Sequence, residues 1–251
     1  MWNAIDSYLP RQVCGVDEYG CGGVFSEVEL VELCGVLPKT AVASFSLADN
    51  RMEEKSVDAL VRALPKTQIV SLDLSKTLPG LEAGVGLARV LPDTKITTLN
   101  LSRNFMGPML AIKLAEVLPK TLITSMDLSA NVLTVEGGLK LVEALEASKL
   151  TSLNLSDNQL CGVNRFGDGS FDGKAIDKLC EVLPKTSLTD LSLALNQLGA
   201  EGGAKLAKVL GSTKITELDV QLNSLSEDSI QKLSKAANTS GCSTSINSIK
   251  A

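Results

Sequence analysis

ITTLNLSRN, the stretch Ile96–Asn104, decides the fold, because close copies of it recur along the chain. The copies start at Val42, Ile69, Ile123, Leu150, Leu188 and Ile215. From 42 to 150 every step is 27 residues, the step from 150 to 188 is 38, and the last step is again 27. A fixed period of this size predicts a stacked repeat architecture, interrupted here by one insertion of 11 residues.

Each unit has a strand half and a helix half. Alternating leucines such as Leu99 and Leu101 predict a strand with one buried face. An asparagine follows three residues after the second leucine in most units, where its amide can serve backbone groups at the turn, and Thr77 interrupts this series. Later leucines four residues apart predict one buried helix face, and Pro in LPKT or LPDT predicts the helix end. These leucine pairs are Leu60/Leu64, Leu87/Leu91, Leu114/Leu118, Leu141/Leu145, Leu179/Leu183 and Leu206/Leu210.

The pattern LxxLxLxxNxL followed by an amphipathic helix resembles the leucine-rich-repeat superfamily. The full helix in each unit is similar to the ribonuclease-inhibitor-like branch, which includes repeat domains of NOD-like receptors and Ran GTPase-activating proteins. The resemblance implies an α/β solenoid of about eight units, a horseshoe with a parallel β-sheet on the concave face and α-helices on the convex face. Ribonuclease inhibitors are far richer in cysteine, and no stretch here carries over a Ran-activating site.

We expect one leucine-rich-repeat domain over residues 1–251, with an N-terminal cap at 1–13, repeats at 14–237 and a C-terminal cap or tail at 238–251. Cys14 to Thr40 matches Cys161 to Thr186, so we expect a first unit with the same insertion and a strand near Asn3 to Leu9. The last helix is predicted at Glu227 to Ala237, followed by a frayed cap or disordered tail. Alternatively, the segment after this helix is not an end, and the chain is one piece of a longer protein.

Composition argues against several functions. Histidine is absent, which removes the commonest general base and metal ligand, and no phosphate-binding glycine loop or zinc spacing is present. The glycine-rich insertion fails as a calcium loop, because the closing position counted from Asn164 is Ala175. The net charge of −5 disfavours nucleic acid, and no apolar run is long enough for a membrane span. We therefore expect no enzymatic activity, metal or cofactor.

The first residues lack the pattern of a signal peptide, so a cytoplasmic location with free thiols is the default expectation. Cys34 and Cys180 occupy a small apolar helix position and are predicted to be buried, whereas Cys21 and Cys242 are the candidates for exposed thiols.

The concave face is where such a scaffold would bind a partner. Asp190, Glu217 and Asp219 cluster near Leu195 and Leu222, which predicts a patch for a basic or amphipathic segment; alternatively, the leucines pack against the tail after Gly241. The other candidates on this face are Asp73, Asn100, Arg103, Asp127 and Asn154. A solvated polar strand face without a tight partner is the competing interpretation.

The two insertions carry exposed-aromatic candidates, Tyr19 and Phe166. Five repeats separate them, so with strands about 4.8 Å apart they would form a two-pronged clamp spanning roughly 25 Å of one rim. The alternative is a duplicated structural turn whose phenylalanine fills the repeat below. The function that we expect is a non-enzymatic scaffold or sensor that recognises a protein partner, of unknown identity, through the concave face and the long loops. A regulator of another enzyme, such as a GTPase-activating protein, is the alternative.

Overall fold

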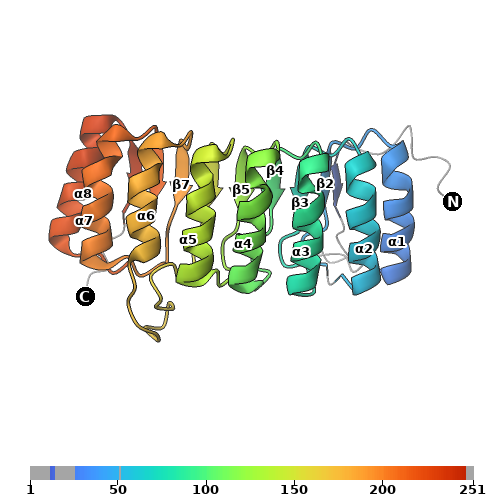
Figure 1. The fold of residues 1–251 in the computed structure, drawn as a ribbon, viewed down its shortest axis with the longest axis horizontal. Coiled ribbons are helices and arrows are strands. Elements are labelled where there is room, and N and C mark those ends of the chain that lie inside the picture. The colour runs from blue at the N-terminus through green and yellow to red at the C-terminus, as the bar shows by residue number, and fades with distance from the viewer. Residues whose placement is uncertain (1–11, 15–25, 51, 247–251) are drawn as a thin grey trace.

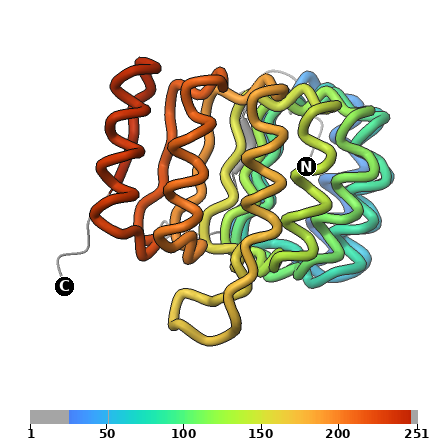
Figure 2. Tube along the Cα trace, turned by 60° about the vertical axis from the view of Figure 1, so that its left-hand side comes forward, coloured from blue at the N-terminus to red at the C-terminus, as the bar shows by residue number. Residues whose placement is uncertain are grey.

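The computed structural model describes the backbone of residues 12–14 and, with side chains, residues 26–50 and 52–246. Helices lie side by side in one layer in front of a row of strands, and the chain progresses steadily from one end of the stack to the other (Figure 1). Seen from the side, the stack is curved and one long loop projects beyond it (Figure 2). The architecture is therefore the predicted α/β solenoid.

The described strands form one nine-stranded sheet in sequential order, and every neighbouring pair is parallel. Each strand is only three residues long, and the register aligns equivalent repeat positions, such as Leu72 with Leu99. The strands are β1 (Gln12–Cys14), β2 (Ser44–Ser46), β3 (Ser71–Asp73), β4 (Thr98–Asn100), β5 (Ser125–Asp127), β6 (Ser152–Asn154), β7 (Asp190–Ser192), β8 (Glu217–Asp219) and β9 (Ser243–Ser245).

One α-helix follows each strand from β1 to β8, and a short 3-10 helix follows each of the first seven α-helices. The α-helices are α1 (Glu27–Val36), α2 (Glu54–Ala63), α3 (Leu81–Val90), α4 (Gly107–Val117), α5 (Thr134–Ala144), α6 (Lys174–Val182), α7 (Gly199–Val209) and α8 (Glu227–Ser240). The 3-10 helices are η2 (Leu37–Lys39), η3 (Leu64–Lys66), η4 (Leu91–Asp93), η5 (Leu118–Lys120), η6 (Leu145–Ala147), η7 (Leu183–Lys185) and η8 (Leu210–Ser212).

The recurring LPKT sequence forms the end of the helical segment. The α-helix ends before the proline, as predicted: α2 ends at Ala63, and Pro65 lies in the first turn of the 3-10 helix that follows, where its missing N–H costs nothing. The threonine then ends the turn: the Thr67 hydroxyl donates to the Leu64 carbonyl at 2.9 Å, and the Thr67 backbone is extended. The same hydroxyl bond recurs at Thr94 and Thr121.

The leucines predicted to be buried form one continuous core between the sheet and the helices. Both members of each predicted helix pair, for example Leu114 and Leu118, are almost fully buried. Strand residues such as Leu99 and Leu101 meet them from the other side. Because each unit buries its apolar face only against its neighbours, stability is distributed along the stack.

The asparagine series forms a buried ladder, as predicted. The Asn131 side chain donates to the carbonyl oxygens of Leu128 in its own unit and Leu101 in the preceding one, at 3.1 and 2.8 Å. Its Oδ1 accepts from the backbone N–H of Asn104 at 3.2 Å. From Asn104 to Asn223, each ladder amide thus joins two repeats at the point where their strands turn out of the sheet.

The N-terminal strand does not lie where the sequence suggested. The strand that pairs with β2 is β1, and the predicted range 3–9 lies outside the described residues. The register places Cys14 opposite Ser46, in the column of Asn154 and not of Cys161. The equivalence of Cys14 with Cys161 was therefore wrong, and the connection from β1 to α1 is shorter than the one from β6 to α6.

Of the two alternatives for the C-terminal segment, a cap or a disordered tail, the described residues up to 246 form a cap. Helix α8 continues to Ser240 and ends at Gly241, whose φ of 72° is the left-handed conformation that glycine favours at helix ends. Strand β9 then pairs with β8 and closes that end of the described sheet. This docking buries Cys242, which the sequence analysis had wrongly placed among the exposed thiols.

Candidate functional site

The corner after each strand has an unusual backbone. A left-handed residue occupies the same corner position in seven repeats, with φ between 51° and 61°: Asp49, Lys76, Arg103, Ala130, Asp157, Leu195 and Leu222. The neighbouring repeat fixes this conformation, because the N–H of Arg103 donates to the Ser129 carbonyl at 2.8 Å and equivalent bonds recur along the stack. The corner therefore holds its side chain in one direction whatever residue stands there.

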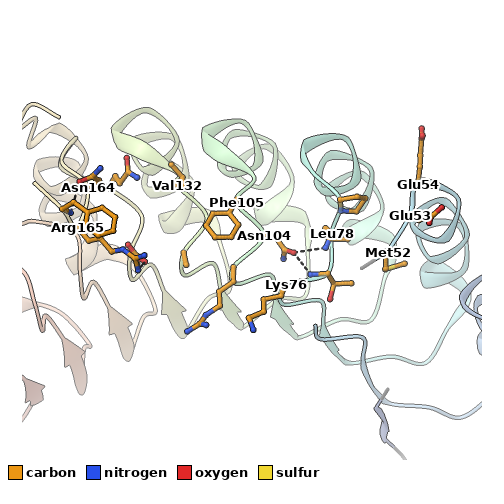
Figure 3. Close-up of a pocket in the computed structure, with 17 residues that line it drawn as sticks. Met52, Glu53, Glu54, Lys76, Leu78, Asn104, Phe105, Val132, Asn164 and Arg165 are labelled. Atoms are coloured by element: carbon orange, nitrogen blue, oxygen red, sulfur yellow. Dashed lines mark hydrogen bonds and ion pairs between the residues drawn. The ribbon is translucent and has the colours of Figure 1, made fainter. Parts of the chain in front are cut away.

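A groove runs along the rim formed by these corners and the loops that lead to the helices (Figure 3). Its volume is about 1280 Å³. Met52, Glu53 and Glu54 line one end, and Asn164, Arg165 and Phe166 line the other. Between the ends it is lined by Lys76, Thr77, Leu78, Pro79, Arg103, Asn104, Phe105, Ala130, Val132, Asp157 and Gln159. We call this feature the rim groove.

Phe105 is the central apolar side chain of the rim groove, where Figure 3 places it between Val132 and Leu78. It is 74% exposed and has a φ of 51°. Val132, the equivalent residue in the next repeat, has a φ of 57°. Bulky or β-branched residues are strained in this region, and strain of this kind concentrates at binding sites.

The insertion between β6 and α6 is a compact hairpin that ends the groove. The Asn164 Oδ1 accepts from the backbone N–H groups of Phe166 and Asp168, at 2.9 and 3.0 Å. A bridge joins Val163 with Gly169, whose φ of 114° requires glycine; a Cβ there would collide with the Gly162 carbonyl. Hydrogen bonds within the hairpin therefore fix its conformation.

The hairpin presents Phe166 to solvent, with 77% of the residue exposed. The Arg165 guanidinium lies 5.0 Å from the centre of its ring and 3.5 Å from the Asp157 carboxylate, which ties the hairpin to the corner of its own repeat. Phe171 is also exposed, so neither phenylalanine fills the repeat below, and that interpretation of the insertion was wrong. Tyr19, the other proposed prong of the clamp, lies outside the described residues.

Charged groups in the rim groove differ in whether they have partners. Lys76 pairs with Asp49 at 3.2 Å, and Arg165 pairs with Asp157. The exposed Arg103 has no ion pair or side-chain hydrogen bond with any residue in the described part of the chain. At the far end, the exposed Glu53 and Glu54 likewise have no cationic partner among the described residues.

The predicted concave-face residues lie at the ends of the strands and have structural bonds of their own. The Asp73 carboxylate accepts from the backbone N–H of Ser75 at 2.9 Å, a local turn that Asx side chains commonly make. The same bond is made by Asn100, Asp127, Asn154 and Asp219. This stripe therefore also shapes the exit of each strand.

Four predicted residues meet at the C-terminal end of the concave face, in a hollow of about 310 Å³. Its charged residues are Asp190, Glu217 and Asp219, with Asn154 beside them, and Ser243 and Ser245 of β9 form its edge. Asp190 and Glu217 are direct register partners on adjacent strands. None of the three carboxylates has an ion pair with a Lys or Arg of the described residues.

The two corner leucines do not line this hollow or the rim groove. Leu195 and Leu222 occupy adjacent corners, where the Leu195 N–H donates to the Gln221 carbonyl at 3.0 Å. Leu222 is 39% exposed, Leu195 is half-buried, and neither belongs to the core. The acidic residues and the leucines therefore lie on different surfaces, the strand face and the corner.

Arg103 and Phe166 were predicted from the sequence as candidate binding residues, whereas Phe105 was not. Phe105 is the variable residue of the NxL pattern, where the other repeats have Arg51, Leu78, Val132, Gln159, Gln197 and Ser224. The available signal was that this position becomes apolar in three consecutive repeats and polar in the later ones. Comparing each repeat column by column would have found it.

Among the described residues, no group of three or more carboxylate or thiol side chains could hold a metal ion. None of the described helices has the length and apolar character needed to cross a bilayer. Cys34, Cys161, Cys180 and Cys242 are free and buried. Burial raises the pKa of the Cys161 thiol to about 12.

A family model described as Leucine Rich repeat matches residues 146–160 and 185–207. No curated protein matches the chain. A solved structure titled "Leiomodin-1 Actin-Binding Site 2 (ABS2)" is similar to it at 18% sequence identity and a TM-score of 0.43, over 63% of this chain and 82% of that chain. A likeness at this level says nothing about what this chain binds. The stack of parallel strands and helices has the fold of a leucine-rich-repeat solenoid, and the family model matches part of it.

Proposed function

We propose that this chain is a non-enzymatic module that holds a protein partner along the rim groove, with the hairpin at residues 161–173 forming one wall. The observation that carries the proposal is the pair of exposed aromatic rings, Phe105 and Phe166, on one groove. Exposed aromatic side chains next to arginines are the usual anchors of protein interfaces. The concave strand face, including Asp73, Asn100, Asp127 and Asn154, borders the groove and is proposed as the secondary contact.

The fixed backbone at Phe105 and Phe166 supports a binding role. An interface gains affinity when its anchors are fixed before the partner arrives, because less conformational entropy is lost on binding. Phe105 is fixed by its left-handed backbone, and Phe166 by the Asn164 bonds and the Asp157–Arg165 ion pair. Neither ring contributes to the core, so their exposed positions are best explained by contact with another molecule.

The test is capture of partners from a lysate of the source organism with three tagged baits. The first is the native chain, and the second carries Phe105→Ser with Phe166→Ser. The third is a matched control, Val28→Ser with Leu122→Ser, which removes exposed apolar side chains from helix α1 and from the helix-to-strand side of the stack.

Proteins retained by the native and control baits, and lost from the groove variant, support the proposal. Equal retention by all three baits, with unchanged circular dichroism, would show that the rim groove is not the binding surface. Retention of nothing by any bait would contradict a tight binding module.

The cytoplasm is the compartment that we propose for this function. The four described cysteines are free thiols, as expected in a reducing environment. Finding the tagged chain in a secreted or oxidising compartment would contradict this assignment.

A further inference from the structure

We propose that the rim groove recognises a short extended peptide segment of mixed charge, in the order basic, acidic, apolar. This inference rests on the proposed function and names the chemistry of the partner. Along the groove, the acidic pair Glu53 and Glu54 comes first, Arg103 and Phe105 of one repeat lie in the middle, and Phe166 lies at the hairpin end. A segment with complementary groups in that order satisfies each of these sites.

The length of the groove sets the length of the segment. It extends from the repeat of β2 to the repeat of β6, which is four repeat spacings. With parallel strands about 4.8 Å apart, four spacings are about 19 Å, or about six residues of extended chain. A helix covering the same span would need about thirteen residues at 1.5 Å each and would be about 10 Å wide. An extended segment spans the groove with about half as many residues, so less conformational entropy is lost in ordering it, and it is the occupant that we propose.

Charge sets the acidic position. The other cations of the groove already have carboxylate partners, Lys76 with Asp49 and Arg165 with Asp157, whereas Arg103 has none among the described residues. Its guanidinium can donate two parallel hydrogen bonds to one carboxylate, an arrangement that lysine cannot provide. Glu53 and Glu54 lie two repeats away, about 10 Å or three extended residues, and favour a basic residue there.

The exposed rings set the apolar position. Phe105 lies one residue beyond Asn104, and Asn104 is held by bonds to the preceding repeat, so the ring and the Arg103 guanidinium project from one rigid corner. An apolar side chain next to the carboxylate of the segment would cover Phe105 and approach Phe166. Removing these two rings from water is the main gain in free energy that the segment can supply.

The experiment is selection of random octapeptides displayed on phage against four immobilised proteins. These are the native chain, Arg103→Glu, Arg103→Lys and the matched control Arg89→Glu, which makes the same charge change at an exposed position on helix α3. The best native-selected peptide is then synthesised, and its dissociation constant is measured by fluorescence anisotropy for all four proteins and for Phe105→Ser with Phe166→Ser.

We expect the native chain to select peptides in which an acidic residue adjoins an apolar one and a basic residue lies about three positions away. Arg103→Glu should weaken the synthesised peptide at least tenfold, Arg103→Lys should weaken it less, and Arg89→Glu should change it less than twofold. Arg103→Glu should also select peptides with a basic residue at the acidic position. Thermal unfolding of each variant confirms that it is folded.

Several outcomes would overturn the inference. They are selection without an acidic preference, equal binding to Arg103→Glu and the native chain, or no selected peptide at all. Peptide binding that is lost in the phenylalanine double variant but unchanged in Arg103→Glu would remove the charge assignment and leave the proposed function intact. Failure of the proposed function itself is recognised separately, by equal retention of lysate proteins on the native and phenylalanine-variant baits.

Discussion

The Oδ1 of Asn104 accepts hydrogen bonds from the backbone N–H groups of both Thr77 and Leu78, at 2.8 and 2.9 Å, so one side chain completes the turn of the preceding repeat (Figure 3). Its Nδ2 donates to the carbonyls of Leu74 and Leu101. Thr77, which interrupts the asparagine series, replaces part of this pattern: its hydroxyl donates to the Leu47 carbonyl at 2.6 Å.

Replacing this asparagine should be costly because several buried backbone groups lose their partners together. Each buried group left unsatisfied costs about 1–3 kcal/mol, so we expect Asn104→Ala to lower the free energy of unfolding by at least about 2 kcal/mol. Urea denaturation followed by circular dichroism measures the change. The matched control is Asn100→Ala in the same repeat, a half-buried position with one turn bond, which should lose less than half as much. Equal losses would contradict the role of the ladder.

Truncating a core leucine in a middle repeat should be equally damaging, for a different reason. Leu114 is fully buried on the inner face of α4, so Leu114→Ala leaves a cavity and should cost about 2–5 kcal/mol. Val28→Ala, at a residue that is 66% exposed on α1, should stay within about 0.5 kcal/mol of the native chain. Chemical denaturation compares the two. A small loss for Leu114→Ala would mean that the neighbouring repeats collapse into the space.

Phe105 should destabilise the free chain, because a bulky residue at positive φ is strained. Asparagine tolerates this conformation, so Phe105→Asn should keep or raise the free energy of unfolding, by up to about 1 kcal/mol, while partner binding is lost. Differential scanning calorimetry and the capture experiment measure the two effects. Gln197→Asn, at the equivalent corner of a later repeat, is the control and should leave binding unchanged. A clear loss of stability in Phe105→Asn would show that the ring has a structural role.

Because three cysteine thiols are buried, we expect the free energy of unfolding to depend on pH in the alkaline range. Burial raises the pKa of Cys34 and Cys180 to about 11 and of Cys161 to about 12, from an ordinary value near 9. The unfolded chain therefore releases these protons first as the pH rises. The stabilisation is complete below pH 9 and is lost between about pH 9 and 12.

The measurement is denaturation in urea at a series of pH values from 8 to 11. Cys161→Ala should show a shallower decline than the native chain over this range, because one of the shifted groups is gone. Iodoacetamide at pH 8 should label Cys34, Cys161 and Cys180 only after unfolding. Rapid labelling of any of them in the folded chain would contradict the burial.

The hairpin should be separable from the fold. Asn164→Ala removes the acceptor of the Phe166 and Asp168 N–H groups but touches no core residue. We expect an unchanged midpoint of thermal unfolding, faster hydrogen exchange over residues 162–172 and weaker partner binding. Asn154→Ala, which removes a similar turn bond outside the hairpin, should not change exchange in that segment. Unchanged exchange in Asn164→Ala would show that other contacts hold the loop.

The repeat fold could be predicted from the sequence because each unit repeats the same local solution. Leu99, Leu101 and Leu114 were correctly assigned to the core, since period and helix spacing fix which face is buried. Where the period weakened, the prediction was less exact: the first strand was placed before Gln12, and the segment of β9 was expected as a cap or a tail without a strand. Three-residue strands carry too little pattern of their own to be recognised without neighbours.

The candidate site was only partly visible in the sequence. Arg103 and Phe166 were predicted individually, as a concave-face residue and as a loop tip, and nothing local joined them. Phe105 was missed because an apolar residue after the ladder position is easily taken for a core residue, which Leu78, after Thr77, indeed is. Phe105 is exposed only because its own left-handed backbone turns the side chain outward.

The sequence by itself determined the period, the buried leucine columns and the asparagine ladder, because these depend on contacts repeated between adjacent units. The tertiary structure decided what the surface offers. Stacking aligns the corners of successive repeats into one groove, and the bonds of Asn164 raise the hairpin at its end. Phe105 and Phe166 therefore share a surface although two repeats separate them, since parallel stacking converts a distance along the chain into a short distance across the rim.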